Sequence, residues 1–346
     1  MIDTIKIFTM INKNTYDKIH NKSIVKTSYS METGEIFYNI TNNHLKGSYD
    51  TSLSVRVGEG AKYKFINMYY IEIEGSYHKI VKGYNSHNGF YNLYEVCNGL
   101  INLVSNSYNV KLPDIKHWFL QRVDIAIVFD LENQLNIKRY LENLHSCNYP
   151  RRNLKNYSDY GGTGLYIPGT TTTLKIYNKY QEFKKHDLKR FKSTDTFNIE
   201  NYLDIIQGYL RFEIEIKKKK LESIYNKKYI RLRNVVYKDL KNIWSDEFMK
   251  LLKFYDNELT LIRDREKVKE RLFNIYGETR GKNLYNFFCS LIIDGISIVK
   301  KNMSKSAYYR QVKFLKDVGV DFSQKLNLED NNNFIDFNPF TFEEVI

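Results

Sequence analysis

Three short apolar segments of the sequence carry polar side chains at every second position. They span 122–130, 173–179 and 211–217. Successive side chains of a β-strand point to opposite faces, so each segment predicts a strand with one apolar and one polar face. The polar positions are Arg122, Asp124 and Asp130, then Lys175, Tyr177 and Lys179, then Arg211, Glu213, Glu215 and Lys217. If these strands are neighbours, one sheet face holds carboxylates, lysines and a tyrosine together.

This combination suits metal-assisted attack on a phosphodiester. Carboxylate oxygens are hard ligands for Mg²⁺ or Mn²⁺, and a bound ion offsets the charge that develops in the transition state. A tyrosine oxygen can attack phosphorus, but the reference pKa of its hydroxyl is about 10, so it needs help to ionise. Lysines two residues from Tyr177, or the metal ion, can give that help.

The same pattern has a more ordinary interpretation. Antiparallel sheets commonly keep one face in solvent, where opposite charges on neighbouring strands form ion pairs. Periodicity alone is more typical of this arrangement than of a catalytic face. Both interpretations stay open on these three segments.

The surrounding elements predict an α+β fold on a largely antiparallel sheet. No clear βαβ repeat is present, which disfavours a parallel sheet. Pro168 and Gly169 separate two β-prone runs and predict a hairpin turn. Further strands are expected over 1–10 and 64–74, helices over 92–105 and 137–147, and the hairpin over 164–178.

From about residue 226 the spacing of apolar residues becomes helical. Helices are predicted over 248–255, 268–276, 284–293 and 304–318, the last with Ser304 as N-cap. The final stretch contains acids but no Lys or Arg. The sequence thus predicts an α+β domain over 1–225, a helical domain over 226–326 and a flexible acidic tail over 327–346.

The charge balance favours a polyanionic partner. The 346 residues include 53 Lys and Arg against 40 Asp and Glu, a net charge of +13. Nucleic acid is the first partner to expect and an acidic membrane surface the second. The chain is also rich in Lys, Asn, Ile and Tyr, as AT-rich genes dictate, so composition by itself adds little.

Other features exclude several classes of protein. Cys97, Cys147 and Cys289 form no CxxC pair, which argues against a zinc ribbon or a disulfide scaffold and suits a reducing cytoplasm. The longest apolar stretch, 287–293, is far shorter than the roughly 20 residues that a membrane helix needs. We expect a cytoplasmic protein with no signal peptide and no membrane partner.

Several of these residues lie in motifs that are similar to the gene II family of filamentous-phage replication initiators. The likeness runs in order along the chain to about residue 328. It is carried by Met1-Ile2-Asp3, by Ile71-Glu72-Ile73-Glu74 followed by 79–83, by Arg122-Val123-Asp124, by 174–182, by Arg211-Phe212-Glu213 with its basic follow-on at 217–220, and by Tyr308-Tyr309-Arg310 through Gly319-Val320.

A more distant likeness is to the Rep_trans plasmid initiators. The runs R-V-D-I-A, K-I-Y-N-K-Y-Q-E and R-F-E-I-E-I-K resemble motifs of those proteins. Both families nick an origin and start rolling-circle replication, and both are thought to be divergent relatives of the HUH nucleases. The seven histidines here include no His-hydrophobic-His pair, so an acidic metal site is implied.

The resemblance implies an HUH-like nuclease domain that nicks one DNA strand and forms a 5′-phosphotyrosine intermediate and a free 3′ hydroxyl. Tyr177 matches the nucleophile, with Tyr180 and Tyr166 as rivals, and Lys179 matches a lysine that steadies the scissile phosphate or lowers the tyrosine pKa. The implied ligands for Mg²⁺ or Mn²⁺ are Asp124 and Glu213, with Glu72 and Glu215 as further candidates.

Origin DNA, single-stranded and duplex, is the implied partner. Two helices within 296–319 suggest a helix-turn-helix or winged-helix reader, although an ordinary helical bundle fits as well. The expected DNA-binding residues are Lys175, Arg122, Arg211, Lys217, Lys218, Lys305, Arg310 and Lys313. No GxxxxGK[ST] loop is present, so a helicase, a polymerase and a single-strand binding protein are expected from the host. A non-catalytic origin-binding protein and a relaxase or transposase relative are the competing interpretations.

Overall fold

The structure is a computed structural model that describes most of the chain. The described residues are 1–34, 36–41, 43–46, 52–59, 68–146, 149, 152, 155–156, 164–190, 197–252, 265–320 and 322. The predicted tail over 327–346 lies outside them.

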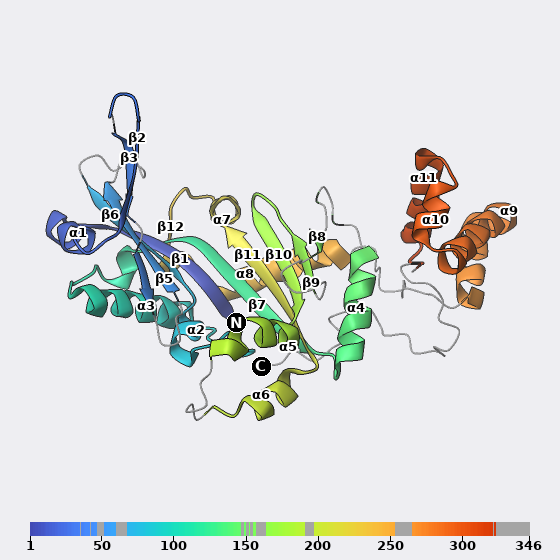
Figure 1. Ribbon diagram of the computed structural model, residues 1–346, viewed down its shortest axis with the longest axis horizontal. Helices are drawn as coiled ribbons and strands as arrows, with labels where there is room; N and C mark the ends of the chain where they lie inside the picture. Colours follow the sequence, from blue (N-terminus) through green and yellow to red (C-terminus); the bar gives the residue numbers. More distant parts are fainter. Residues whose placement is uncertain are drawn as a thin grey trace.

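An antiparallel sheet forms the centre of the first part of the chain (Figure 1). Its strand order is β4-β5-β6-β1-β7-β11-β10-β9-β8, and β12 pairs with β7 beyond the end of β11. The strands are β1 (Ile2–Ile11), β4 (Asn43–Lys46), β5 (Ser52–Glu59), β6 (Tyr69–Gly75), β7 (Phe119–Asp130), β8 (Lys155–Asn156), β9 (Gly164–Ile167), β10 (Thr172–Asn178), β11 (Tyr209–Lys217) and β12 (Ile230–Arg231), with β2 (Val25–Tyr29) and β3 (Ile36–Thr41) as a separate pair. The predicted α+β class with a largely antiparallel sheet is confirmed.

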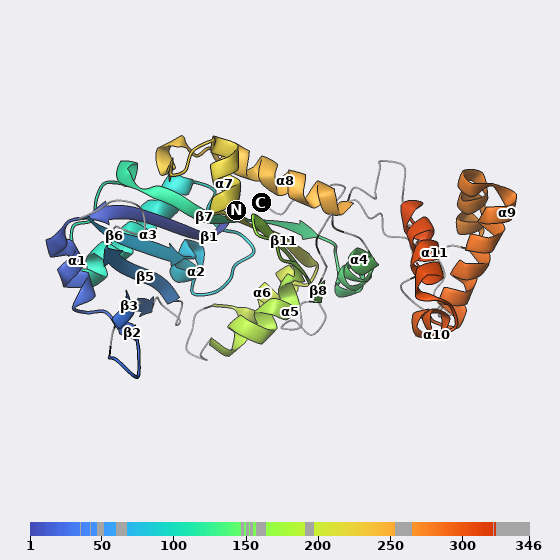
Figure 2. The same ribbon diagram turned by 90° about the horizontal axis from the view of Figure 1, so that it is seen from above.

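Helices lie on both sides of this sheet. Figure 2 shows α8 along one side and α5 and α6 along the other. The helices are α1 (Lys13–His20), α2 (Tyr77–Lys82), α3 (Leu93–Tyr108), α4 (Gln134–Ser146), α5 (Lys179–Glu182), α6 (Ile199–Ile206), α7 (Lys218–Tyr225) and α8 (Tyr237–Leu252). The predicted helices at α3 and α4 and the hairpin of β9 and β10 are confirmed. The strand expected over 64–74 is observed from Tyr69, and 64–67 lie outside the described residues.

Two irregularities in the pairing of β1 with β7 decide which side chains share the polar face. Ile2 pairs with Ile125 but Ile5 with Val123, so β1 carries one extra residue between them. On β7, Gln121 is the extra residue, because Lys6 pairs with Arg122 and Ile7 with Leu120. A bulge of this kind shifts the alternation of side chains by one position.

Helix α8 belongs to the core of the sheet. The Trp244 indole donates a hydrogen bond to the Phe212 carbonyl at 3.3 Å, and the Phe248 ring packs 5.0 Å from that of Phe212. Apolar burial of this kind is the main stabilising term in a domain. We therefore propose a domain boundary after Leu252 rather than at residues 225 and 226.

A second apolar core holds the last three described helices together. These are α9 (Arg265–Ile293), α10 (Ile296–Lys301) and α11 (Lys305–Asp317), seen together in Figure 1. Gly277 has a φ of 74°, and the helix axis turns there. A Cβ at Gly281 would meet the Leu272 carbonyl oxygen at 2.8 Å, so only glycine lets the two halves of α9 pack this closely.

The predicted helical C-terminal part is confirmed, with Ser304 as N-cap of α11. The helix expected over 248–255 is observed only as the end of α8, since 253–255 are outside the described residues. Among the described helices, none combines the length and the apolar character that crossing a bilayer requires.

Candidate active site

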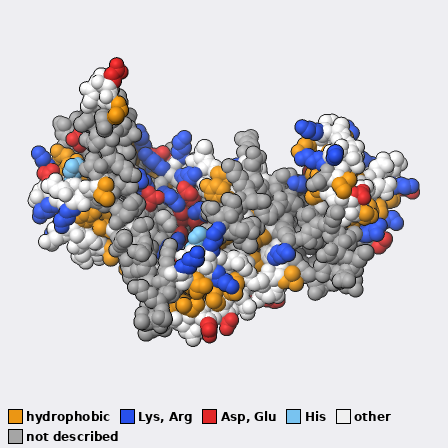
Figure 3. Space-filling view, viewed as in Figure 1, with side chains coloured by type: hydrophobic (Ala, Val, Ile, Leu, Met, Phe, Trp, Pro, Cys, Tyr) orange, Lys and Arg blue, Asp and Glu red, His pale blue; other side chains and the backbone are white. Residues whose placement is uncertain are grey.

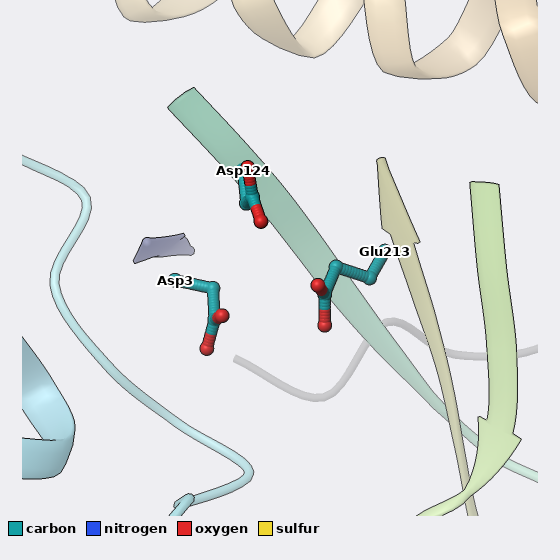
Figure 4. A group of neighbouring side chains, drawn as sticks. All are labelled: Asp3, Asp124 and Glu213. Atoms are coloured by element: carbon teal, nitrogen blue, oxygen red, sulfur yellow. The ribbon is translucent and has the colours of Figure 1, made fainter. Parts of the chain in front are cut away.

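Three carboxyl groups from neighbouring strands meet on the polar face of the sheet (Figure 4). They belong to Asp3 of β1, Asp124 of β7 and Glu213 of β11, and one oxygen of each lies within 4.8 Å of the others. All three side chains are buried. Buried carboxylates gathered this closely are a donor set that fits a small divalent cation such as Mg²⁺ or Mn²⁺.

Each of these carboxylates also has a protein cation as partner. Arg122 donates to both oxygens of Asp124, at 2.8 and 2.6 Å. Arg211 donates to Asp3 at 2.7 Å and Lys175 to Glu213 at 2.6 Å. Buried acids are tolerated when they are paired in this way.

The pKa values show that the three acids are not equally satisfied. Burial and the charge of Glu213 raise the pKa of Asp124 to about 7, against the opposing effects of Arg122 and Lys175. Burial also acts to raise the pKa of Asp3 and of Glu213, but their cationic neighbours outweigh it and lower both pKa values. Crowded carboxylates of this kind ionise fully only when further positive charge is supplied.

Tyr177 of β10 lies directly against the carboxylate group. Its side chain is 3% exposed, and its hydroxyl donates a hydrogen bond to Glu213 Oε2 at 3.2 Å. The Asn85 amide donates to the same hydroxyl at 3.5 Å. Burial and the charge of Glu213 hold the pKa of Tyr177 well above its usual range, although Arg211 opposes them. The phenol is therefore protonated, with a carboxylate placed to accept its proton.

A buried polar chain links Tyr177 to Asp3. His78 Nε2 lies 3.2 Å from Asn85 Oδ1 and 3.5 Å from Asp3 Oδ1, and its Nδ1 lies 3.0 Å from Ser76 Oγ. An imidazole that donates from Nε2 and accepts at Nδ1 satisfies all three neighbours as a neutral ring. Burial lowers the pKa of His78 to about 3, which fits the neutral form.

The free energy of unfolding of the sheet domain should fall as the pH drops below about 6.5. The unfolded chain protonates His78 near pH 6.5, whereas the folded chain keeps it neutral to about pH 3, so acid favours the unfolded state between these values. From pH 7.5 to 5.5 this group alone should remove about 1.4 kcal/mol.

Urea unfolding followed by tryptophan fluorescence measures this, because both tryptophans, Trp118 and Trp244, are buried in the sheet domain. The variant His78→Gln should lose this part of the pH dependence whatever its absolute stability. Equal pH dependence in the two proteins would contradict the assignment.

Lys179 does not share a strand face with Tyr177, as the sequence pattern had predicted. β10 ends at Asn178, whose side chain accepts a hydrogen bond from Gln181 N and caps α5. Lys179 is the first residue of that helix, fully buried and paired with Glu182 at 2.5 Å. Its predicted contact with phosphate stays a prediction.

The other expected ligands lie outside the carboxylate group. Glu72 is opposite Phe8 and Arg56 in the sheet. Glu215 is directly opposite Asp124, but its Oε1 lies 3.5 Å from the Arg122 Nε.

The rival tyrosines are placed less favourably than Tyr177. Tyr166 lies on β9, opposite Lys175 and one strand further from Asp124. Tyr180 packs against the small apolar cluster of α5 and α6, with Lys184 5.0 Å from its ring centre.

The expected DNA-binding residues fall into three settings. Lys175, Arg122 and Arg211 are paired with the buried acids and Arg211 is fully buried. Lys217 and Lys218 are half-buried at the junction of β11 and α7. Lys305, Arg310 and Lys313 are exposed on α11, which follows α10 after a turn of three residues.

Asp3, His78 and Asn85 were not singled out for the site from the sequence. The opening Met1-Ile2-Asp3 contributed to the family likeness, which was a signal for Asp3. No sequence signal pointed to His78 or Asn85, because they reach the site from α2 and the segment after it.

Comparisons with known proteins agree with this arrangement. The Phage_CRI family model, described as the N-terminal part of the phage replication-associated protein of gene II, matches residues 1–239. The replication-associated protein of this type from Enterobacteria phage M13 is 23% identical over 319 residues, covering 82% of this chain and 76% of that protein. The corresponding protein of Salmonella phage IKe is 21% identical over 256 residues, covering 65% of this chain and 60% of that protein.

One solved structure, of a rolling circle replication initiator protein from Geobacillus stearothermophilus, matches 65% of this chain and 77% of that chain. Its sequence identity is 14% and its TM-score 0.28, too low to establish a shared fold. The family match alone covers more than two thirds of the 346 residues. The chain belongs to the gene II family of phage replication-associated proteins.

Proposed function

We propose that this protein is a rolling-circle replication initiator that nicks one strand of origin DNA through attack by Tyr177. The observation that carries the proposal is the hydrogen bond from the Tyr177 hydroxyl to Glu213, one of three buried carboxylates that face a common point. A nucleophile beside a proton acceptor and a hard-cation site is the constellation that phosphodiester transesterification needs.

The residues of the chain divide the proposed reaction between them. Asp3, Asp124 and Glu213 would hold Mg²⁺ or Mn²⁺. Such an ion, when bound, polarises a phosphate oxygen and offsets developing negative charge. Glu213 accepts the proton of Tyr177, and Asn85 orients the phenol oxygen.

The bond changes balance without an energy source. The Tyr177 oxygen forms a bond to phosphorus, the bond from phosphorus to the 3′ oxygen breaks, and that oxygen takes up a proton to become a 3′ hydroxyl. The protein keeps the 5′ phosphate as a phosphotyrosine ester, so rejoining needs no ATP. Because Tyr177 is only 3% exposed, the scissile phosphate reaches it after the segment that carries Asn85 moves aside.

A nicking assay on supercoiled plasmid that carries the replicon's origin tests the proposal. With Mn²⁺ or Mg²⁺ the full chain should convert the plasmid to the open circular form and leave protein attached to a 5′ end. With EDTA it should do neither. Binding of origin DNA with no cleavage in either metal would favour the non-catalytic alternative.

We further propose that α11 contacts duplex origin DNA. A turn of three residues between two helices is the spacing of a helix-turn-helix, and α11 exposes a tyrosine and several cations. The triple variant Lys305→Gln, Arg310→Gln and Lys313→Gln should weaken duplex binding and lower its salt dependence, by about 0.9 in slope for each phosphate that is no longer neutralised.

Cleavage of a single-stranded origin oligonucleotide should be unchanged in that variant. The matched control changes three exposed lysines of α9, in the variant Lys267→Gln, Lys269→Gln and Lys282→Gln. If both triple variants weaken duplex binding equally, α11 is not the reader. A helicase, a polymerase and a single-strand binding protein of the host are proposed partners at the nicked origin.

A further inference from the structure

An aromatic cluster lies where β7 begins, next to β12. The rings of Phe8 and Phe119 stack with their centres 5.1 Å apart and 24° between their planes. Tyr229 meets both rings edge-on, at 5.9 and 6.1 Å. Phe8 is buried, whereas Phe119 and Tyr229 are half-buried and reach the surface.

This cluster shares the sheet face of the carboxylate group. Phe119 pairs with Phe8, and Arg122 with Lys6, so the extra residue Gln121 returns Phe119 to the face that carries Arg122. Asp124 is five residues further along the same strand, a separation of roughly 17 Å at the usual rise of a strand.

Cations surround the two half-buried rings. Lys218 and Lys228 place their ammonium groups 5.2 and 5.8 Å from the centre of the Tyr229 ring. The Arg231 guanidinium lies 5.9 Å from the centre of the Phe119 ring. Of these cations, Lys218 also pairs with Glu222, at 3.7 Å. Figure 3 shows Lys and Arg side chains bordering the Asp and Glu side chains at the middle of this face.

We propose that Phe119, Lys218, Lys228, Tyr229 and Arg231, the aromatic-basic patch, bind single-stranded DNA that flanks the scissile phosphate. Aromatic rings and guanidinium planes stack on unpaired bases, while cations beside them follow the phosphates. Duplex DNA does not offer its base faces to such a surface. The inference rests on the proposed nicking function, because it assigns the patch to one flank of the strand held at Tyr177.

Binding of fluorescein-labelled oligothymidylate to the full chain in EDTA tests this without any cleavage. The variant Tyr229→Leu keeps an apolar side chain but removes the ring, and it should weaken binding by about tenfold. The matched control is Tyr94→Leu, a tyrosine 39% exposed on α3, which should bind as the unchanged protein does.

The exposed Arg231 gives a second variant that carries little risk to folding. Arg231→Gln should reduce the slope of log affinity against log salt by about 0.7, the value for one phosphate of a single strand. The control Lys138→Gln changes an exposed lysine of α4 and should leave the slope unchanged.

If Tyr229→Leu and Arg231→Gln both bind like their controls, the patch does not bind single-stranded DNA and the inference is overturned. This readout is separate from nicking. Patch-dependent binding in a protein that never nicks origin plasmid would support the patch and count against the proposed reaction.

Discussion

Replacing Tyr177 with phenylalanine should abolish nicking and the covalent adduct, with a fall in rate on the order of 10⁴-fold or more. The substitution removes only the hydroxyl that would attack phosphorus, the one that donates to Glu213 in the carboxylate group. Gel analysis of origin plasmid and of labelled oligonucleotide measures both products.

The loss should be one of chemistry and not of folding. Glu213 keeps its ion pair with Lys175 in the variant, so the cost is one neutral hydrogen bond, about 1 kcal/mol. Origin binding should be retained. Tyr166→Phe and Tyr180→Phe are matched controls and should nick normally. An adduct that persists in Tyr177→Phe and disappears in one of the controls would assign the nucleophile to the latter.

The polar faces of β7, β10 and β11 could be predicted because these strands pair with each other without interruption. Asp124 faces Glu215, and Glu213 faces Lys175, as an unbroken alternation of side chains requires. The alternative of a solvated face laced by ion pairs was partly right, since every acid of the group has a cationic partner. Burial separates the two cases: the ion pairs of this group involve side chains that are almost entirely enclosed.

Asp3 could not be placed by the same rule. Ile5 and Ile7 point to the core, so a regular strand would direct Asp3 there too. The extra residue of β1 between Ile2 and Ile5 turns Asp3 to the polar face instead. Nothing local in the sequence marks this bulge, because its register depends on the partner strand.

The end of β10 was more legible than the prediction made of it. Asn178 followed three residues later by Gln181 is a helix-start pattern, since an asparagine side chain at the N-cap accepts from the backbone of the third helical residue. Extending the strand through Asn178 wrongly placed Lys179 on the face of Tyr177. By contrast, the contact of Asn85 with Tyr177 joins segments 92 residues apart, and no local pattern specifies it.

Removing the charge of Asp124 should eliminate tight binding of the metal while leaving the fold in place. Asp124→Asn takes away one of three oxygen ligands, and the affinity for Mn²⁺ should fall by about a hundredfold or more, with a matching loss of nicking. Titration calorimetry with Mn²⁺ on the full chain measures the affinity without any DNA.

The metal-free fold should tolerate this change because it already accommodates a neutral Asp124. The pKa of Asp124 is raised to about 7, so near neutral pH much of the population carries the uncharged carboxyl group that asparagine imitates. Arg122 is not left alone, since Glu74 and Glu215 lie 3.0 and 3.5 Å from it. Breaking a buried ion pair usually costs several kcal/mol, but here the remaining partners and the partial exposure of Arg122 reduce that cost.

Two further variants make the result specific. Asp3→Asn should weaken Mn²⁺ binding as strongly, although it also costs stability because the fully buried Arg211 loses its closest acid. Glu215→Gln is the matched control: it removes a carboxylate directly opposite Asp124 that lies outside the group, and Mn²⁺ affinity should hardly change. If Glu215→Gln lowers the affinity as much as Asp124→Asn, the ion is attracted by the overall negative charge of this face. Only unequal effects agree with a site built from Asp3, Asp124 and Glu213.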